Sequence, residues 1–129
     1  MLAKTSYKNI KVNDTYYYGK HMIMTCEACS ESLLDVGIMK KFLQDLADAI
    51  DMIRYGEPTV ARFGEGIEEG LSGVQLITTS ALTIHTNDQA RDLYLDVFSC
   101  KWFDEQTVID FVKNFFAPED YTYQVILRK

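Results

Sequence analysis

The chain has 129 residues, of which 47% are hydrophobic and 25% are charged, and its formal net charge is −6. These totals predict one globular domain over residues 1–129, with a core large enough to fold without metals or disulfides. The negative charge argues against nucleic acid and anionic membranes as partners, and no apolar run approaches the ~20 residues of a membrane span.

The N-terminal quarter contains a mixed lead-in and a pair of cysteines. Residues Met1–Asp14 are polar and mixed, so we expect a frayed segment, with no signal peptide. Cys26 and Cys29 have CxxC spacing, but zinc needs four ligands and the sequence offers no second pair at metal-ligand spacing. We therefore expect no metal site and ordinary strand-end cysteines, with a redox or metal role as the minor alternative. With Cys100 the cysteine count is odd, which favours a reducing, cytoplasmic location.

The first predicted elements are a strand and a long helix. Tyr16–Thr25 is rich in aromatic and apolar residues and predicts a strand. A polar loop with candidate helix caps Ser30, Ser32 and Asp35 follows. From Val36 to Arg54 apolar residues recur at three- and four-residue spacing, which predicts an amphipathic helix. The apolar positions of this stripe are Met39, Phe42, Leu43, Leu46, Ile50 and Ile53.

The remaining elements are mostly strands. GEGIEEG (64–70) combines three glycines with three glutamates and predicts a flexible acidic loop. Asp104 is the expected cap of a second helix, whose buried stripe is Val108, Phe111, Val112 and Phe115. The predicted segments are strands Thr59–Phe63, Ser72–Thr78, Ala81–Thr86, Arg91–Ser99 and Tyr121–Leu127, and helix Glu105–Phe116. The short connections favour an α+β two-layer sandwich, with a largely antiparallel sheet and two helices on one face.

A serine and a histidine share one predicted strand. Ser80 and His85 are five residues apart in TTSALTIHT (78–86). An extended strand rises roughly 3.3 Å per residue, so the two lie about 16 Å apart, too far for a nucleophile–base pair formed by this segment alone. Either they are unrelated, or a bend and neighbouring strands bring other groups to each.

Three segments in order resemble the small prokaryotic S-adenosylmethionine decarboxylase proenzymes, a pyruvoyl-dependent family. The family patterns GVSGV, ESHxTIHT and D-hydrophobic-aromatic-TC correspond to GLSGV (70–74), TSALTIHT (79–86) and DVFSC (96–100). The intervals between the second serine, the histidine and the cysteine match without a gap. YGKHMIM (18–24) is also similar to the first strand of the family.

The resemblance implies a self-cleaving enzyme. Ser80 would attack the carbonyl of Thr79, and elimination would cut the chain between them, leaving a pyruvoyl cofactor derived from Ser80. Ser72 would support the step by hydrogen bonding, and His85 would be the base that takes the α-proton. The pyruvoyl carbonyl would form a Schiff base with S-adenosylmethionine, and Cys100 would return a proton to the decarboxylated carbon. The product would supply aminopropyl groups for spermidine, and a homodimer with shared sites is implied.

Several residues depart from the family pattern. Glutamate precedes the cleaved serine in the family, where this chain has Thr79, and the following histidine is Ala81 here. The WPE-like turn, whose glutamate holds the ribose hydroxyls, is replaced by Asn87–Gln89. Gln89 can still bind a hydroxyl without a charge-assisted contact, and Asp88 is an open alternative. Phe63 is the candidate that stacks on adenine, and its alternative interpretation is a strand-end core residue.

These departures leave other functions open. The same scaffold could decarboxylate arginine or ornithine, which the altered turn and the acidic loop would suit. A relative that stays uncut could act as a regulatory subunit, and Thr79 and Ala81 motivate that alternative. Taken singly, Ser80, His85 and Cys100 are more often core or rim residues; it is their joint spacing that favours catalysis.

Overall fold

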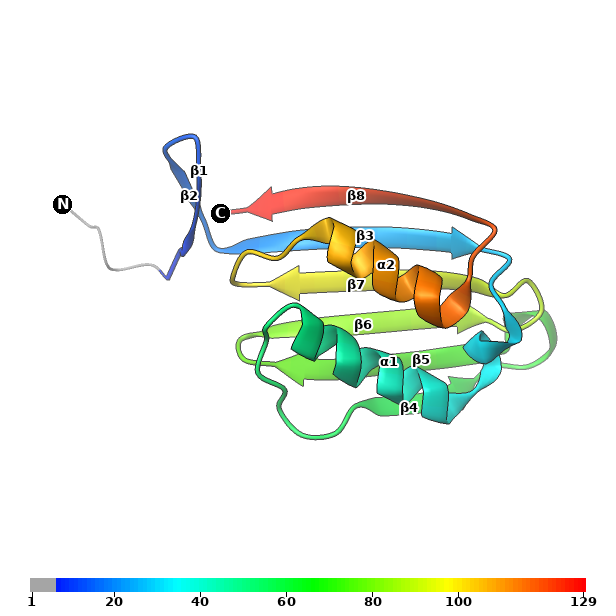
Figure 1. Cartoon of the computed structure of the whole chain (residues 1–129). Coiled ribbons are helices and arrows are strands. Elements are labelled where there is room, and N and C mark those ends of the chain that lie inside the picture. The colour runs from blue at the N-terminus through cyan, green and yellow to red at the C-terminus, as the bar shows by residue number, and fades with distance from the viewer. Residues whose placement is uncertain (1–6) are drawn as a thin grey trace.

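The computed structural model describes residues 7–129, and its main layer is a six-stranded antiparallel sheet in the order β4-β5-β6-β7-β3-β8. Both helices lie on one face of this sheet (Figure 1). The sheet strands are β3 (Gly19–Glu27), β4 (Thr59–Phe63), β5 (Gly70–Ile77), β6 (Ser80–Asn87), β7 (Asp92–Ser99) and β8 (Asp120–Arg128). The helices are α1 (Val36–Ala49) and α2 (Glu105–Phe116), with short 3-10 turns at Glu31–Leu34 and Gly66–Glu68. The predicted α+β two-layer class is confirmed.

The N-terminal segment is more ordered than the sequence predicts. Residues 1–6 of the expected lead-in lie outside the described residues, but β1 (Ile10–Val12) pairs with β2 (Thr15–Tyr17) in a small separate hairpin. Ile10 is buried, which anchors this hairpin. The single strand predicted over Tyr16–Thr25 is divided, because the chain passes from the hairpin into the main sheet at Tyr18.

Helix α1 begins where the sequence predicts and ends earlier. The Asp35 side chain accepts a hydrogen bond from the Ile38 N–H at 2.9 Å, so of the three candidates Asp35 is the cap. The helix ends at Ala49, because Asp51 adopts a left-handed conformation with φ of 58°. The prediction that the helix reaches Arg54 is therefore wrong, and Ile53 is 74% exposed instead of lying on the buried stripe.

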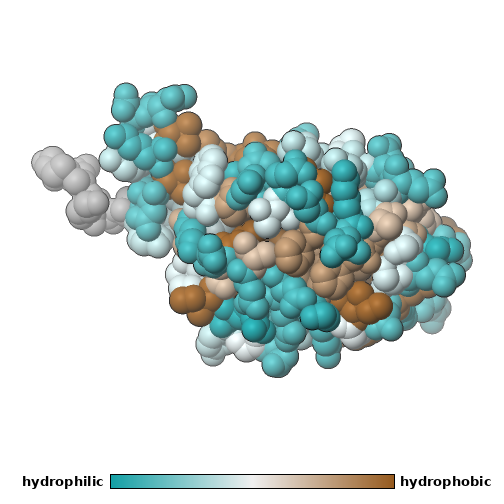
Figure 2. Space-filling model, in the orientation of Figure 1, coloured by the Kyte–Doolittle hydropathy of each residue, from teal (hydrophilic) through white to brown (hydrophobic). Residues whose placement is uncertain are grey.

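The core lies between the sheet and the two helices. Helix α2 has the predicted bounds, and the Asp104 side chain caps it by accepting from the Gln106 N–H at 3.0 Å. Its most buried side chains include Ile109 and Phe116, whereas the predicted Phe111 and Phe115 are only half-buried. The strands contribute alternating residues to this core, including Met22, Met24, Leu82, Ile84, Leu93, Leu95 and Val97. Hydrophilic side chains cover most of the helix-bearing surface (Figure 2).

The opposite face of the sheet is open in the described part of the chain. Alternation along the strands directs Phe63, Leu76, Tyr94 and Ile126 to this face, and each is at least 42% exposed. His21 also lies on it, with Nε2 3.0 Å from Asp96 Oδ1. This open face is the surface on which part of the candidate site lies.

Among the helices described, none is both long and apolar enough to cross a membrane.

Candidate active site

A strained turn joins β5 to β6 at the bond predicted to be cut. Thr79 has φ of 54°, a left-handed conformation that β-branched residues rarely adopt. Ser80 is the first residue of β6, and its Oγ accepts a hydrogen bond from the Cys100 N–H at 2.9 Å. The serine hydroxyl is therefore positioned directly beside the strained Thr79–Ser80 peptide bond.

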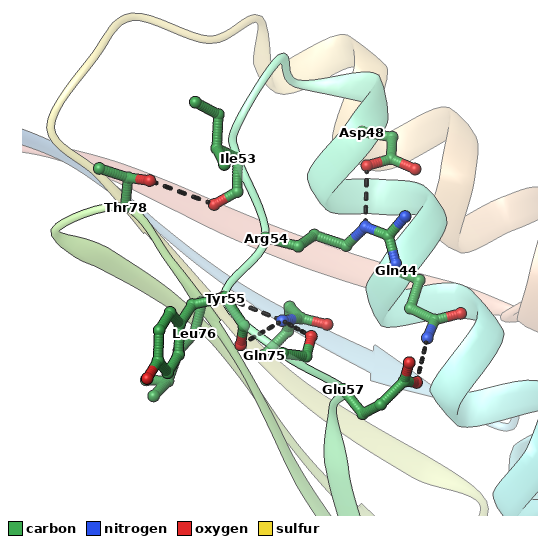
Figure 3. A network of polar contacts seen from close by, with 10 residues as sticks. Gln44, Asp48, Ile53, Arg54, Tyr55, Glu57, Gln75, Leu76 and Thr78 are labelled. Carbon is green, nitrogen blue, oxygen red and sulfur yellow. Dashed lines mark hydrogen bonds and ion pairs between the residues drawn. The ribbon is translucent and has the colours of Figure 1, made fainter.

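The loop between α1 and β4 holds this turn in place. The Ile53 carbonyl accepts from the Thr78 N–H at 3.0 Å and from the Thr78 hydroxyl at 3.4 Å. The Tyr55 N–H donates to the Leu76 carbonyl at 2.8 Å, and the buried Gln75 amide donates to carbonyl groups on both segments (Figure 3). Two further side-chain pairs tie the loop to α1, Arg54–Asp48 and Gln44–Glu57. The turn cannot relax without breaking these contacts.

Cys100 completes the first cluster. Its Sγ lies 3.0 Å from Thr79 Oγ1 and 4.0 Å from the Tyr7 hydroxyl. Burial raises the pKa of the Cys100 thiol, but hydrogen bonds from Thr79 and two other hydroxyls outweigh it, so that this pKa lies below its ordinary value. The hydrogen bond to the thiol raises the pKa of Tyr7 in turn. The hydroxyl of the predicted nucleophile and a thiol with a lowered pKa thus share one end of β6.

Ser72 and His85 form a second cluster on the open face. They are directly opposite each other on β5 and β6, and Ser72 Oγ lies 2.9 Å from His85 Nδ1. Both line an open pocket of about 290 Å³ together with Phe63 and five other residues of β4, β5 and β6. Phe63 is 62% exposed, which excludes its alternative interpretation as a core residue. This pocket offers an aromatic ring and an imidazole held by a hydroxyl.

The two clusters lie at opposite ends of β6. The strand pairs continuously with β5 from Ser80, opposite Ile77, to His85, opposite Ser72. Five residues of extended strand place Ser80 and His85 about 16 Å apart. The bend considered from the sequence does not occur, so one copy of the chain does not bring the predicted nucleophile and base together.

Two residues of the turn after β6, Asn87 and Asp88, are held by contacts within the fold. The Asn87 side chain donates to the Ile67 carbonyl at 2.6 Å and so anchors the acidic loop. Asp88 is paired with Arg62, which also donates to the Leu34 carbonyl at 2.6 Å. Asp88 is therefore engaged within the fold, whereas Gln89 is exposed beside the pocket end of the sheet.

Tyr18 is a site residue that the sequence did not indicate. Its hydroxyl donates to the Thr79 carbonyl oxygen at 3.4 Å, across 61 positions of the sequence. Its ring stacks on Phe98, with centroids 5.9 Å apart. Within YYYG, nothing distinguishes Tyr18 from the two preceding tyrosines except the glycine that follows it.

Lys20 stabilises the segment that follows Cys100. It is fully buried, and its Nζ donates to the Phe103 carbonyl at 2.6 Å and to Glu105 Oε1 at 2.5 Å. The ammonium also lies 3.7 Å from the centroid of the Trp102 ring. A hydrogen bond from Lys20 holds the pKa of Glu105 below its ordinary value. The start of α2 and the cysteine segment are thereby fixed to β3.

The CxxC pair lies apart from these clusters. Cys26 and Cys29 are buried and unbridged, and burial raises the pKa of their thiols to about 12 and about 11. Thiols with such pKa values are protonated and unreactive near neutrality. Their placement matches ordinary buried cysteines.

Known proteins resemble this chain in sequence and in fold. A family model described as S-adenosylmethionine decarboxylase matches residues 20–129. S-adenosylmethionine decarboxylase proenzymes of Clostridium botulinum strains Loch Maree and Langeland are 28% and 27% identical over 100 residues, which cover 76% of this chain and 83% of each relative. The crystal structure of the adenosylmethionine decarboxylase from Aquifex aeolicus VF5 superposes with a TM-score of 0.72, at 19% identity, over 87% of this chain and 91% of that one.

Proposed function

The chain belongs to the S-adenosylmethionine decarboxylase family, and from that membership we propose that it is a self-processing, pyruvoyl-dependent decarboxylase of S-adenosylmethionine. On this proposal residues 1–129 form one cytoplasmic enzyme domain, cut between Thr79 and Ser80, whose product serves spermidine synthesis. The observation that carries the proposal is the strained turn at Thr79, where the Cys100 N–H holds the Ser80 hydroxyl and the Cys100 thiol contacts the Thr79 side-chain hydroxyl.

Self-cleavage begins with an acyl shift. The Ser80 Oγ forms a bond to the carbonyl carbon of Thr79, the Thr79–Ser80 C–N bond breaks, and the hydroxyl proton ends on the freed nitrogen. Removal of the Ser80 α-proton then breaks the Cβ–Oγ bond, leaving a Thr79 carboxylate and dehydroalanine. Water replaces the nitrogen, ammonia leaves, and a pyruvoyl group remains at the new N-terminus. Release of the left-handed strain at Thr79 favours the cut.

The residues around Ser80 fit the group that this reaction leaves. A pyruvoyl group supplies an electron-withdrawing carbonyl that condenses with a substrate amine and accepts the electrons of the breaking carboxyl bond. The Cys100 N–H, which holds the Ser80 Oγ, and the adjacent Cys100 Sγ would orient it. The thiol is also the nearby acid that can return a proton to the decarboxylated carbon.

The base must come from a second copy of the chain. His85 lies about 16 Å from Ser80 along its own strand, too far to take the α-proton. A homodimer would bring the Ser72–His85 pair of one copy to the Ser80–Cys100 cluster of the other. In the tautomer in which Nδ1–H donates to Ser72 Oγ, Nε2 is free to accept that proton. The exposed apolar residues of the open face are the surface that we propose the two copies share.

The two proposed substrate contacts are Phe63, which lines the pocket, and Gln89, in the turn that follows β6. Phe63 presents an exposed ring on which adenine can stack, and Gln89 offers an amide to the ribose hydroxyls. The amide lacks the charge that a carboxylate would provide, so nucleoside binding is weaker than with glutamate by on the order of 1.5–3 kcal/mol. The acidic loop next to this turn suits the positive charge of a sulfonium.

Release of labelled carbon dioxide tests the substrate. Processed protein should decarboxylate carboxyl-labelled S-adenosylmethionine, faster after Gln89→Glu and more slowly after Phe63→Ala, whereas Ser80→Ala should be inactive. Arginine and ornithine have no nucleoside, so neither pocket substitution should affect their turnover. Carbon dioxide released from either amino acid but not from S-adenosylmethionine would favour that alternative substrate, and a processed protein inactive on all three would contradict the decarboxylase proposal.

A further inference from the structure

We infer that the Tyr18 hydroxyl stabilises the negative charge that develops on the Thr79 carbonyl oxygen during self-cleavage, an inference that rests on the proposed processing at Ser80. Attack on an amide carbonyl places an electron pair on its oxygen, and a fixed donor at that oxygen lowers the barrier. Tyr18 would thus be a catalytic residue of the processing step.

The donors at this turn are divided between the two reacting atoms. The Cys100 N–H donates to the Ser80 Oγ and so holds the nucleophile. The Tyr18 hydroxyl is the side-chain donor that reaches the Thr79 carbonyl oxygen among the described residues, at 3.4 Å. This distance is long for a neutral hydrogen bond, and such contacts shorten as the acceptor gains charge. The geometry matches a donor whose contact strengthens in the transition state.

Tyr18 is fixed by packing on rigid elements. Its ring stacks on Phe98 at an interplanar angle of 20°, and the ring of Tyr7 meets its edge with centroids 6.1 Å apart. Its backbone N–H donates to the Arg128 carbonyl at 2.7 Å. Gly19 leaves the space that Phe98 fills, since a Cβ there would lie 2.5 Å from the Phe98 ring. A preorganised donor of this kind needs little rearrangement as charge develops.

The acceptor is fixed as well. The contacts between Thr78 and Ile53 hold the residue before Thr79, and the pairing of Ile77 with Ser80 holds the two ends of the turn. The donor belongs to the start of β3, and the acceptor belongs to the hairpin between β5 and β6. Two segments far apart in the sequence are thus held at the bond that breaks.

Tyr18 contributes a hydrogen bond and transfers no proton. As the Ser80 Oγ bonds to the Thr79 carbon, the carbonyl π electrons move onto oxygen, where the Tyr18 O–H donates. When the Thr79–Ser80 C–N bond breaks, that electron pair re-forms the carbonyl, and the proton of the Ser80 hydroxyl is bound to the freed nitrogen. After elimination the same oxygen belongs to the Thr79 carboxylate, to which Tyr18 can still donate.

A processing time course tests the inference in the full chain. Freshly purified Tyr18→Phe should be cut on the order of 10²-fold more slowly than wild type, because one oxyanion donor is lost. Tyr16→Phe is the matched control, since Tyr16 is exposed on the separate hairpin, and it should be cut at the wild-type rate. In a Ser80→Ala background, Tyr18→Phe should keep the melting temperature of its parent, because the ring packing is retained.

Hydroxylamine separates a slow acyl shift from a slow elimination. It cleaves an accumulated ester but not an amide, so it should not cut Tyr18→Phe chains, while it should cut His85→Ala chains, in which elimination is blocked. The inference alone would be overturned if Tyr18→Phe were processed at the wild-type rate or if it accumulated as an ester. It would also be overturned if Tyr18→Phe were slowed only because it had lost its fold. A wild-type chain that stays uncut would overturn the proposed self-processing together with it.

Discussion

Thr79 combines two properties that a two-residue hairpin turn normally avoids, a β-branched side chain and a left-handed backbone. Asparagine or glycine is the usual choice where φ is positive. Strain of this kind costs on the order of 1–3 kcal/mol, and the contacts of Thr78 with Ile53 maintain it. In the proposed mechanism only the carbonyl group of Thr79 would react, so threonine in place of the family glutamate is compatible with cleavage, and its side chain contacts Cys100.

The role of Cys100 can be tested separately from cleavage. Cys100→Ala should leave processing largely intact but reduce turnover, and the pyruvoyl group should be lost to transamination more often, because the proton is misplaced. In the wild type the acid form of the thiol is required, so turnover should fall as pH rises through its pKa. If Cys100→Ala kept the wild-type turnover and the same fall of turnover at high pH, the thiol would have no part in the mechanism.

The strands and helices follow from local patterns, whereas the contacts between them do not. Alternation identifies β5, β6 and β7 to within two residues, and the helix pattern and capping residue identify α2. The sequence does not predict the end of α1, because the apolar spacing continues through Ile53 while Asp51 turns the backbone out of the helix. Ser72 and His85 become neighbours through strand register, and Tyr18 reaches Thr79 through the sheet order. Such pairings depend on topology, which residue spacing does not encode.

Removing either partner of the Lys20–Glu105 ion pair, which joins β3 to α2, should lower stability, but by different amounts. Glu105→Gln leaves the buried Lys20 ammonium without its carboxylate and should lower the free energy of unfolding by about 2 kcal/mol, the size of a hydrogen bond between charged groups. Lys20→Met should cost less, because methionine fills the buried site and the half-buried Glu105 can be hydrated at the helix N-terminus. Urea unfolding in a Ser80→Ala background measures both, with the exposed Glu119→Gln as control.

The pH dependence of that pair has a defined sign. The pKa of Glu105 is lower in the folded state than in the unfolded state, so its stabilisation is present above the unfolded value of ~4.3 and is lost as pH falls through the folded value. The stability difference between wild type and Glu105→Gln should therefore shrink in acid. Equal losses for Lys20→Met and Glu105→Gln, or a difference that does not change with pH, would contradict this account of the pair.

At the scale of the whole molecule, one copy holds two incomplete halves of a site. The Ser80–Cys100 cluster and the Ser72–His85 cluster lie at opposite ends of the same straight strand. The first cluster contains the predicted nucleophile, Ser80, and the second contains the predicted base, His85, so neither cluster contains both. We propose that two copies meet at the open sheet face, which carries exposed apolar residues. Processing should therefore require both Ser80 in the chain that is cut and His85 in its partner.

Intact-mass spectrometry of processed protein tests this central claim most directly. Wild-type protein should appear as two chains, residues 1–79 and 80–129, the second bearing an N-terminal pyruvoyl group. Ser80→Ala and His85→Ala should each remain full-length when produced alone; in co-expressed mixtures His85→Ala chains should be cut while Ser80→Ala chains stay whole. Full-length wild-type protein after long incubation would contradict self-processing, and His85→Ala chains cut without a partner would contradict the shared site.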